Sequence, residues 1–146
     1  MNAEPTDGGF RNGPLTGPLT GLAEAVLGEI AARLRALAET GEESVIDLRS
    51  LPLTPADRQE LEERLGHGEV CAGLDIGGLS EVWECGYPGV WWVRHLDEDG
   101  VPRAERLEIA PVPAILVTHQ DDITAAAARL QRDCAARPAQ EDPHHA

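Results

Sequence analysis

The chain has 146 residues, of which 42% are hydrophobic, so it is long enough for one domain with a modest core. Its 26 acidic residues outnumber its 12 basic residues, all of them arginines, and give a formal net charge of -14. This charge repels phosphate backbones and argues against nucleic acid as a partner, and no apolar run reaches the roughly 20 residues of a membrane span. The chain shows no signal peptide and no CxxC pair, so we expect reduced thiols and a cytoplasmic location.

The first predicted element is a helix over residues 19–39. Residues 1–18 are rich in glycine and proline and are expected to form a flexible leader. In the helix, apolar residues recur at steps of three and four, Thr20 or Thr16 is the expected cap, and Gly41 ends the element. The stripe consists of Leu19, Leu22, Val26, Ile30, Leu34 and Leu37. We expect this stripe to pack on a sheet; docking on another protein or on a second copy is the alternative.

A short strand over residues 44–49 and a second helix over residues 55–65 follow. Thr54 is the expected N-cap of this helix, Pro55 occupies the first helical position, and Asp57 places a carboxylate near the positive end of the helix dipole.

Four further strands are predicted as an antiparallel meander, over residues 69–76, 80–84, 90–96 and 103–109. Residues 69–76 alternate apolar and polar side chains, as in a half-buried strand. The sequence Tyr87-Pro88-Gly89 suits a type II turn, and Asp99-Gly100 is a strong hairpin signal.

The last predicted helix spans residues 120–136, after Pro111 and Pro113 have ended the sheet. Ile123, Ala127, Leu130 and Cys134 form its expected inner stripe, so Cys134 is predicted to be a small buried hydrophobe. Residues 138–146 form a polar tail. The prediction is therefore one α+β domain over residues 19–137, a mostly antiparallel four- to five-stranded sheet with helices packed chiefly on one face.

The aromatic residues concentrate in the stretch from Ser80 to His95. Trp91 and Trp92 are adjacent in a strand, so they point to opposite faces of the sheet. We therefore expect at least one tryptophan to be partly exposed. Since large aromatic side chains anchor interfaces, Trp83, Tyr87, Trp91 and Trp92 are the candidate partner-binding residues.

No catalytic residue, metal site or cofactor is predicted. Cys85 and His95 would pair across a hairpin, but any antiparallel hairpin produces such pairs by chance. Cys71 with Cys85 and His95 lacks a recognised zinc spacing, and the acidic turn from Asp97 to Asp99 lacks the EF-hand pattern. No glycine-rich phosphate loop with its lysine is present.

A set of short segments between residues 44 and 124 carries a more specific signal. These segments are SVIDLRSLPLT at 44–54, DRQELEERLG at 57–66, GEV at 68–70, SEVWE at 80–84, YPGVWWVR at 87–94, ERLEI at 105–109 and VPAIL at 112–116. In this order and spacing they resemble the C-terminal domain of the hydrogenase expression/formation proteins of the HupH/HyaF type.

The resemblance implies a cytoplasmic accessory protein without enzymatic activity, a chaperone in the maturation of nickel–iron uptake hydrogenase. Its implied partners are the iron–sulfur small-subunit precursor before export and a thioredoxin-like co-chaperone. Two alternatives stay open: a redox or metal-handling protein that uses Cys71, Cys85 or Cys134, and a generic interaction or self-assembly module built on the helix at 19–39.

Overall fold

The computed structural model describes residues 17–75 and 78–137. The chain falls into two compact units that divide after Pro113, and each is described by itself. The predicted polar tail and the predicted flexible leader up to residue 16 lie outside the described residues.

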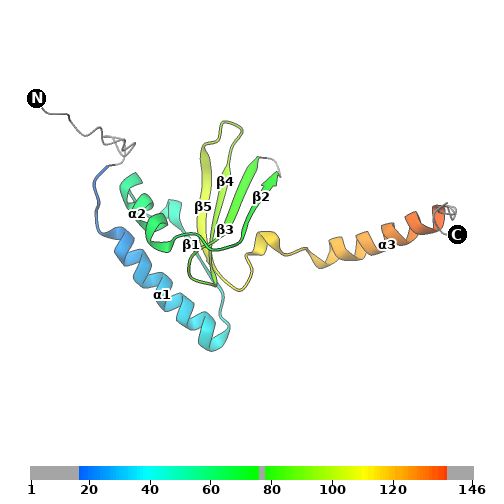
Figure 1. Cartoon of the computed structure of the whole chain (residues 1–146), viewed down its shortest axis with the longest axis horizontal. Coiled ribbons are helices and arrows are strands. Elements are labelled where there is room, and N and C mark those ends of the chain that lie inside the picture. The colour runs from blue at the N-terminus through cyan, green and yellow to red at the C-terminus, as the bar shows by residue number, and fades with distance from the viewer. Residues whose placement is uncertain (1–16, 76–77, 138–146) are drawn as a thin grey trace, which may run out of the picture. The chain divides into compact units, whose positions relative to one another are not determined.

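The first unit is built on a five-stranded antiparallel sheet with the strand order β1-β5-β4-β3-β2 (Figure 1). The strands are β1 (Ser44–Asp47), β2 (Cys71–Asp75), β3 (Leu79–Glu84), β4 (Val90–Leu96) and β5 (Pro102–Ile109). Strands β2 to β5 form the predicted meander, and β1 adds a fifth strand beside β5. The predicted α+β class and antiparallel sheet are confirmed.

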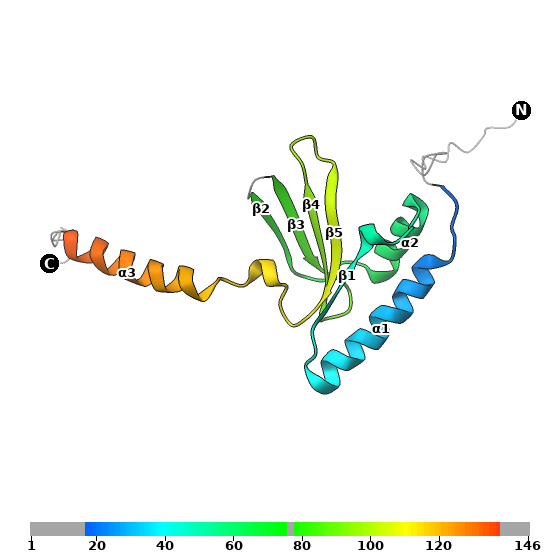
Figure 2. The same cartoon turned by 180° about the vertical axis from the view of Figure 1, so that it is seen from behind.

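Helices α1 (Leu22–Thr40) and α2 (Pro55–Leu65) pack on the same face of this sheet (Figure 2). For these two helices the structure agrees with the predicted packing of helices chiefly on one face. The reason is visible in the core, where Leu61 and Leu65 of α2 join Ile30 of α1 in one cluster with Trp92 and Leu107 of the sheet. We call this side of the sheet the helix-covered face.

Helix α1 begins three residues later than its apolar stripe predicts. Gly21 is its N-cap in the left-handed conformation, and Leu19 lies outside the helix and is exposed. The hydroxyl of Thr20, an expected cap, accepts a hydrogen bond from the N–H of Leu22 at 3.3 Å and donates to the carboxylate of Asp57 at 2.6 Å. The helix ends at Gly41 as predicted, since this residue has a φ of 78° that suits glycine.

The start of α2 confirms the cap that its sequence predicts. Thr54 Oγ1 accepts a hydrogen bond from the N–H of Asp57, and the Asp57 carboxylate accepts one from the N–H of Thr54, which completes a capping box. Asp57 is fully buried. Its hydrogen bonds from Thr20 and Thr54 lower the pKa of the carboxyl to about 2, with the Thr20 hydroxyl as the largest cause.

Both predicted turns are present in the meander. The N–H of Val90 donates to the carbonyl of Tyr87 at 3.0 Å, and Gly89 has the positive φ that a type II turn requires. At the next hairpin, Gly100 has a φ of 78°, and the Asp97 carboxylate accepts hydrogen bonds from two backbone N–H groups of the loop.

The second unit contains α3 (Gln120–Ala136), preceded by a short 3-10 turn at Ala114–Leu116. Every residue of α3 is exposed. The expectation of a buried inner stripe is therefore wrong: Ile123 is 47% exposed and Leu130 is 64% exposed, and Cys134 is an exposed thiol. Within the described residues, no helix combines the length and the apolar character needed to cross a membrane.

Candidate functional site

Two tryptophans form the centre of the helix-covered face. Trp83 on β3 and Trp92 on β4 are cross-strand partners, and their rings stack with centroids 5.5 Å apart. His67, between α2 and β2, also stacks on Trp83 at 5.0 Å, and the Arg94 guanidinium lies over the Trp83 ring at 5.0 Å. Such stacked and cation–π contacts add to the apolar burial of the rings. The stack joins the sheet to the segment that leaves α2.

A buried carboxylate lies beside this stack. Glu105 on β5 has a fully buried side chain, and it accepts hydrogen bonds from Trp92 Nε1 at 3.0 Å and Arg94 Nε at 2.7 Å. Arg58 of α2 forms an ion pair with its other oxygen. Because a buried charge is costly unless it is paired, these three donors explain how Glu105 is tolerated in the core. Burial, and then the nearby charge of Arg94, lowers the pKa of Arg58.

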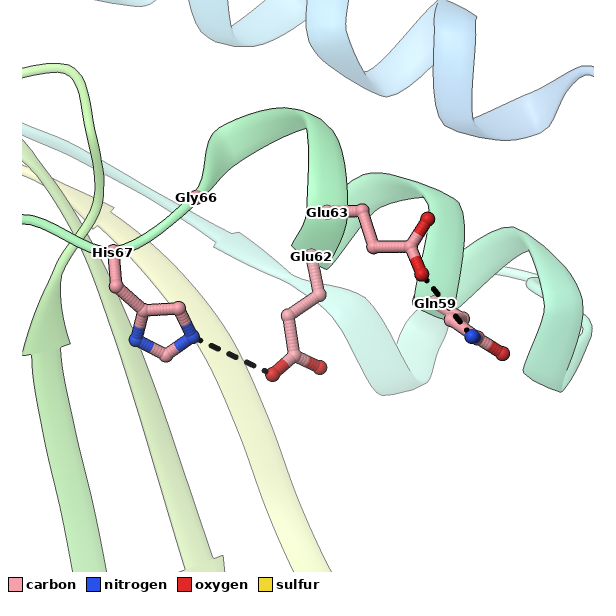
Figure 3. A pocket seen from close by; sticks show the side chains of 5 residues that line it. All are labelled: Gln59, Glu62, Glu63, Gly66 and His67. Carbon is pink, nitrogen blue, oxygen red and sulfur yellow. Dashed lines mark hydrogen bonds and ion pairs between the residues drawn. The ribbon is translucent and has the colours of Figure 1, made fainter. Parts of the chain in front are cut away.

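A surface hollow of about 470 Å³ opens at the C-terminal end of α2 (Figure 3). It is lined by Gln59, Glu62, Glu63, Gly66 and His67. Glu62 lies 3.9 Å from His67 Nε2, and its second oxygen lies 3.5 Å from Arg94. Gln59 donates to the carboxylate of Glu63 at 3.1 Å. Two carboxylates beside one imidazole make a polar, mainly anionic hollow whose chemistry suits a cationic side chain.

The exposed Tyr87 turn is attached to the same end of α2. The N–H of Gly86 donates to the carbonyl of Leu65 at 2.8 Å, so the turn is fixed beside Gly66 and His67 of the hollow. Tyr87 is 54% exposed. The turn and the hollow therefore belong to one surface region, which we call the α2-end surface.

The three tryptophans are all buried, with 6% exposure at most, so the expectation that at least one is partly exposed is wrong. Trp91 and Trp92 do point to opposite faces, as strand parity predicts. On the face opposite the helices, the Trp91 indole donates to the carbonyl of Ala110 at 3.0 Å, and its neighbours Val82 and Val93 are buried as well. Of the four predicted partner-binding residues, Tyr87 alone is accessible.

The candidate Cys85–His95 pair does not form. Cys85 lies on the helix-covered face, whereas His95 lies on the opposite face and faces Ser80, with 2.6 Å between Nδ1 and Oγ. The other ring nitrogen of His95 is 3.2 Å from an Arg106 nitrogen, which can only donate. His95 Nδ1 therefore carries the hydrogen and donates to Ser80, the wrong arrangement for a base that activates a serine.

The cysteines occupy three separate environments. Burial raises the pKa of the Cys85 thiol to about 12, with smaller contributions from Glu62 and Glu84, so this thiol is a poor nucleophile near neutral pH. Cys71 is exposed on the edge strand β2, and Cys134 is exposed on α3. Across residues 17–75 and 78–137, no three His, Cys, Asp or Glu side chains are grouped to hold a metal ion.

Several residues of the site were not singled out by the sequence. Glu62, His67, Arg94 and Glu105 form its polar part. All but His67 lie in segments that carry the family resemblance, but the sequence assigned no role to any of the four. One signal was present for Glu105, because it shares the strand face of Leu107 and Ile109. A charged residue at a core-facing position of a strand implies a buried partner.

Comparisons with known proteins place these features in a family context. A family model described as the C-terminal conserved region of the HupH hydrogenase expression protein matches residues 22–136. A solved structure of the hydrogenase expression protein HupH from Thiobacillus denitrificans ATCC 25259 superposes with a TM-score of 0.76 and 42% identity. That match covers 81% of this chain and 98% of the solved chain.

Curated relatives give the same family. The chain is 31% identical over 86 residues to the hydrogenase expression/formation protein HoxQ of Azotobacter vinelandii. It is 32% identical over 89 residues to the hydrogenase-1 operon protein HyaF of Escherichia coli K12. These alignments cover 59% and 61% of this chain but 30% and 31% of the relatives, so the chain spans less than a third of the curated proteins that it matches.

Proposed function

The chain belongs to the HupH hydrogenase expression protein family, and we propose that it is a non-enzymatic chaperone in the maturation of nickel–iron uptake hydrogenase. The proposed client is the iron–sulfur small-subunit precursor, bound in the cytoplasm before export. A thioredoxin-like co-chaperone is the proposed companion.

The observation that carries this proposal is the extent of the family match. It runs from residue 22 to residue 136 and therefore includes the sheet and all three helices. The similarity to the Thiobacillus denitrificans HupH structure covers nearly all of that chain at 42% identity, so both the fold and many side chains are shared.

We propose that the client binds at the α2-end surface. Tyr87 offers an exposed aromatic ring, and Glu62 and Glu63 offer carboxylates in the adjoining hollow. The buried tryptophans Trp83 and Trp92 act indirectly in this proposal, because they hold His67 and the strands beneath it. An aromatic anchor beside charged groups is typical of a protein interface.

The chemistry of this surface favours a basic segment of the client. The chain has a net charge of -14, and two of its carboxylates, those of Glu62 and Glu63, lie close together in the hollow. Arginine or lysine side chains would be attracted over a long range and would then form charge-assisted hydrogen bonds. Such binding weakens as salt screens the charges.

The test is retrieval of the small-subunit precursor by the tagged full chain, at low and at high salt. We expect Tyr87→Ala combined with Glu63→Gln to weaken binding by about tenfold or more, since interface anchors contribute 1–2 kcal/mol or above. The matched control is Glu42→Gln with Glu43→Gln, an exposed acidic pair between α1 and β1. This control removes more charge but leaves the α2-end surface intact.

Two results would contradict the proposal. If the wild-type chain does not retrieve the small-subunit precursor, the proposed chaperone function is wrong. If the precursor is retrieved equally by the Tyr87/Glu63 variant, with its fold verified by circular dichroism, then the function stands and the α2-end surface is the wrong site.

A further inference from the structure

The feature that the proposed function does not use is helix α3 (Figure 1), which carries apolar side chains along one face. Its residues are spaced by four, three and four positions, which is the heptad spacing of a coiled-coil seam. The seam consists of Ile123, Ala127, Leu130 and Cys134. Helices in proteins gain most of their stability from packing such a face, yet all four side chains are exposed. This face therefore needs a partner.

A hollow lies on this face near the C-terminal end of α3. It has a volume of about 440 Å³ and is lined by Leu130, Asp133, Cys134 and Arg137. These residues follow one another at steps of three, one and three, which is the four-residue hole of knobs-into-holes packing. A side chain from a facing helix would occupy this hole.

We propose that the occupant is α3 of a second copy of this chain, paired antiparallel. In this register Ile123 faces Cys134 of the second copy and fills the hole beside it, and Ala127 faces Leu130 of the second copy. Each layer then places a large side chain opposite a small one, which fills the seam evenly. This inference is independent of the proposed chaperone function.

The parallel arrangement is disfavoured by size and by charge. In a parallel pair, Ala127 would face Ala127 of the second copy, and these two small side chains would leave a void between layers of larger side chains. The parallel pair would also bring together the two acidic first turns, each with Asp121 and Asp122. The antiparallel pair instead sets each acidic turn near the arginine-bearing end of the other helix, at Arg132 and Arg137, and opposes the two helix dipoles.

The interface is small, so the dimer is expected to be weak. A helix of 17 residues is about 26 Å long and offers four seam layers, which is less than the area buried in standard stable interfaces. We therefore expect a mass in solution that rises with protein concentration rather than a permanent dimer.

Disulfide trapping tests the pairing and its direction in the full chain. The parent carries Cys71→Ser, so Cys134 is its one exposed thiol among the described residues, while Cys85 is buried. Adding Ile123→Cys should give a covalent dimer on mild oxidation, because position 123 faces Cys134 of the second copy. The matched control is Ala125→Cys, on the opposite side of the helix.

The expected result is about tenfold more covalent dimer for Ile123→Cys than for Ala125→Cys, since a disulfide requires facing positions within about 7 Å. The parent should not crosslink, because its two Cys134 residues would lie about 16 Å apart along the pair. A bond within one helix between positions 123 and 134 is excluded by the same distance. Leu130→Glu should abolish the concentration-dependent rise in mass.

Three results would overturn the inference. Crosslinking of the parent through Cys134 alone would indicate a parallel pair. A dimer that persists in Leu130→Glu would use another surface. If the mass stays monomeric at every concentration and Ile123→Cys crosslinks no more than its control, then a second copy of this chain does not cover the apolar face of α3. Circular dichroism and tryptophan fluorescence of each variant separate these results from misfolding.

Discussion

Helices α1 and α3 have the same kind of apolar stripe and opposite environments. In α1, Ala23, Val26 and Ile30 are 5% exposed or less and belong to the main core cluster. In α3, Ile123 and Leu130 are 47% and 64% exposed. Helical periodicity therefore identifies a face that favours burial, but it does not identify the surface that buries this face.

The reason lies in what each helix meets. The stripe of α1 meets a sheet face that presents Trp92, Leu107 and Ile109, all fully buried. Helix α3 belongs to the second unit, where no residue of the helix is buried. Substitutions that remove the same chemistry from the two units should therefore differ in their effects.

The largest effect is expected from Trp92→Ala in the core of the first unit. This change leaves a cavity, removes the stack on Trp83 and removes a hydrogen bond to Glu105. We expect the free energy of unfolding to fall by about 3–5 kcal/mol. Urea denaturation followed by circular dichroism measures it. Tyr87→Ala, at an exposed aromatic residue, is the control and should change this energy little. A loss for Trp92→Ala that is equally small would contradict the prediction.

The second prediction compares the two helices directly. Ile30→Ala should lower the free energy of unfolding by about 2–5 kcal/mol, because it opens a cavity under α1. Leu130→Ala, at low protein concentration, should change it by about 0.5 kcal/mol or less, as for most surface substitutions. Thermal denaturation of both variants provides the measurement. A loss at Leu130 as large as that at Ile30 would mean that α3 is buried in solution.

The third prediction concerns charge. Glu105→Gln removes the buried carboxylate that pairs with Arg58 and Arg94. Since both arginines retain some access to solvent, we expect a loss of about 1–3 kcal/mol in the free energy of unfolding. Asp133→Asn, at an exposed carboxylate of α3, is the matched control and should be nearly neutral. If Glu105→Gln leaves the free energy of unfolding unchanged, the ion pairs of Glu105 with Arg58 and Arg94 do not stabilise the fold.

The smallest expected effect is a change in how steeply stability declines in acid. The pKa of Asp57 is about 2 in the folded protein and 3.8 ordinarily, so its ionised form favours folding. This stabilisation is fully present above pH 4 and is lost as the pH falls from about 4 to about 2. Asp57→Asn should therefore flatten the decline of stability across this range.

Urea denaturation at stepped pH values between 5 and 2 measures that decline. Asp121→Asn is the control, because Asp121 lies in the first turn of α3 with a side chain that is 93% exposed. It should decline as steeply as the wild type. If Asp57→Asn also does so, the hydrogen bonds from Thr20 and Thr54 do not lower this pKa.

Much of the fold follows from local sequence signals. Thr54 with Asp57 predicted the capping box, Gly41 predicted the end of α1, and the Tyr87 and Asp99 turns predicted two of the three hairpins of the meander. The candidate site was predicted less well. Tyr87 was found because aromatic residues are rare in this chain, whereas the hollow depends on Glu62 and His67, which meet only when α2 packs on the sheet.

The elements, the strand parity that separates Trp91 from Trp92, and the family could all be predicted from the sequence, because they depend on neighbouring residues and on spacing. Three further features are visible only in the folded protein: all three tryptophans are buried, α1 and α2 share one face of the sheet, and Cys85 and His95 lie on opposite faces. The folded structure also leaves the α3 stripe exposed. The physical reason is that burial and charge pairing depend on residues distant in the chain, and local periodicity carries no information about which surfaces meet.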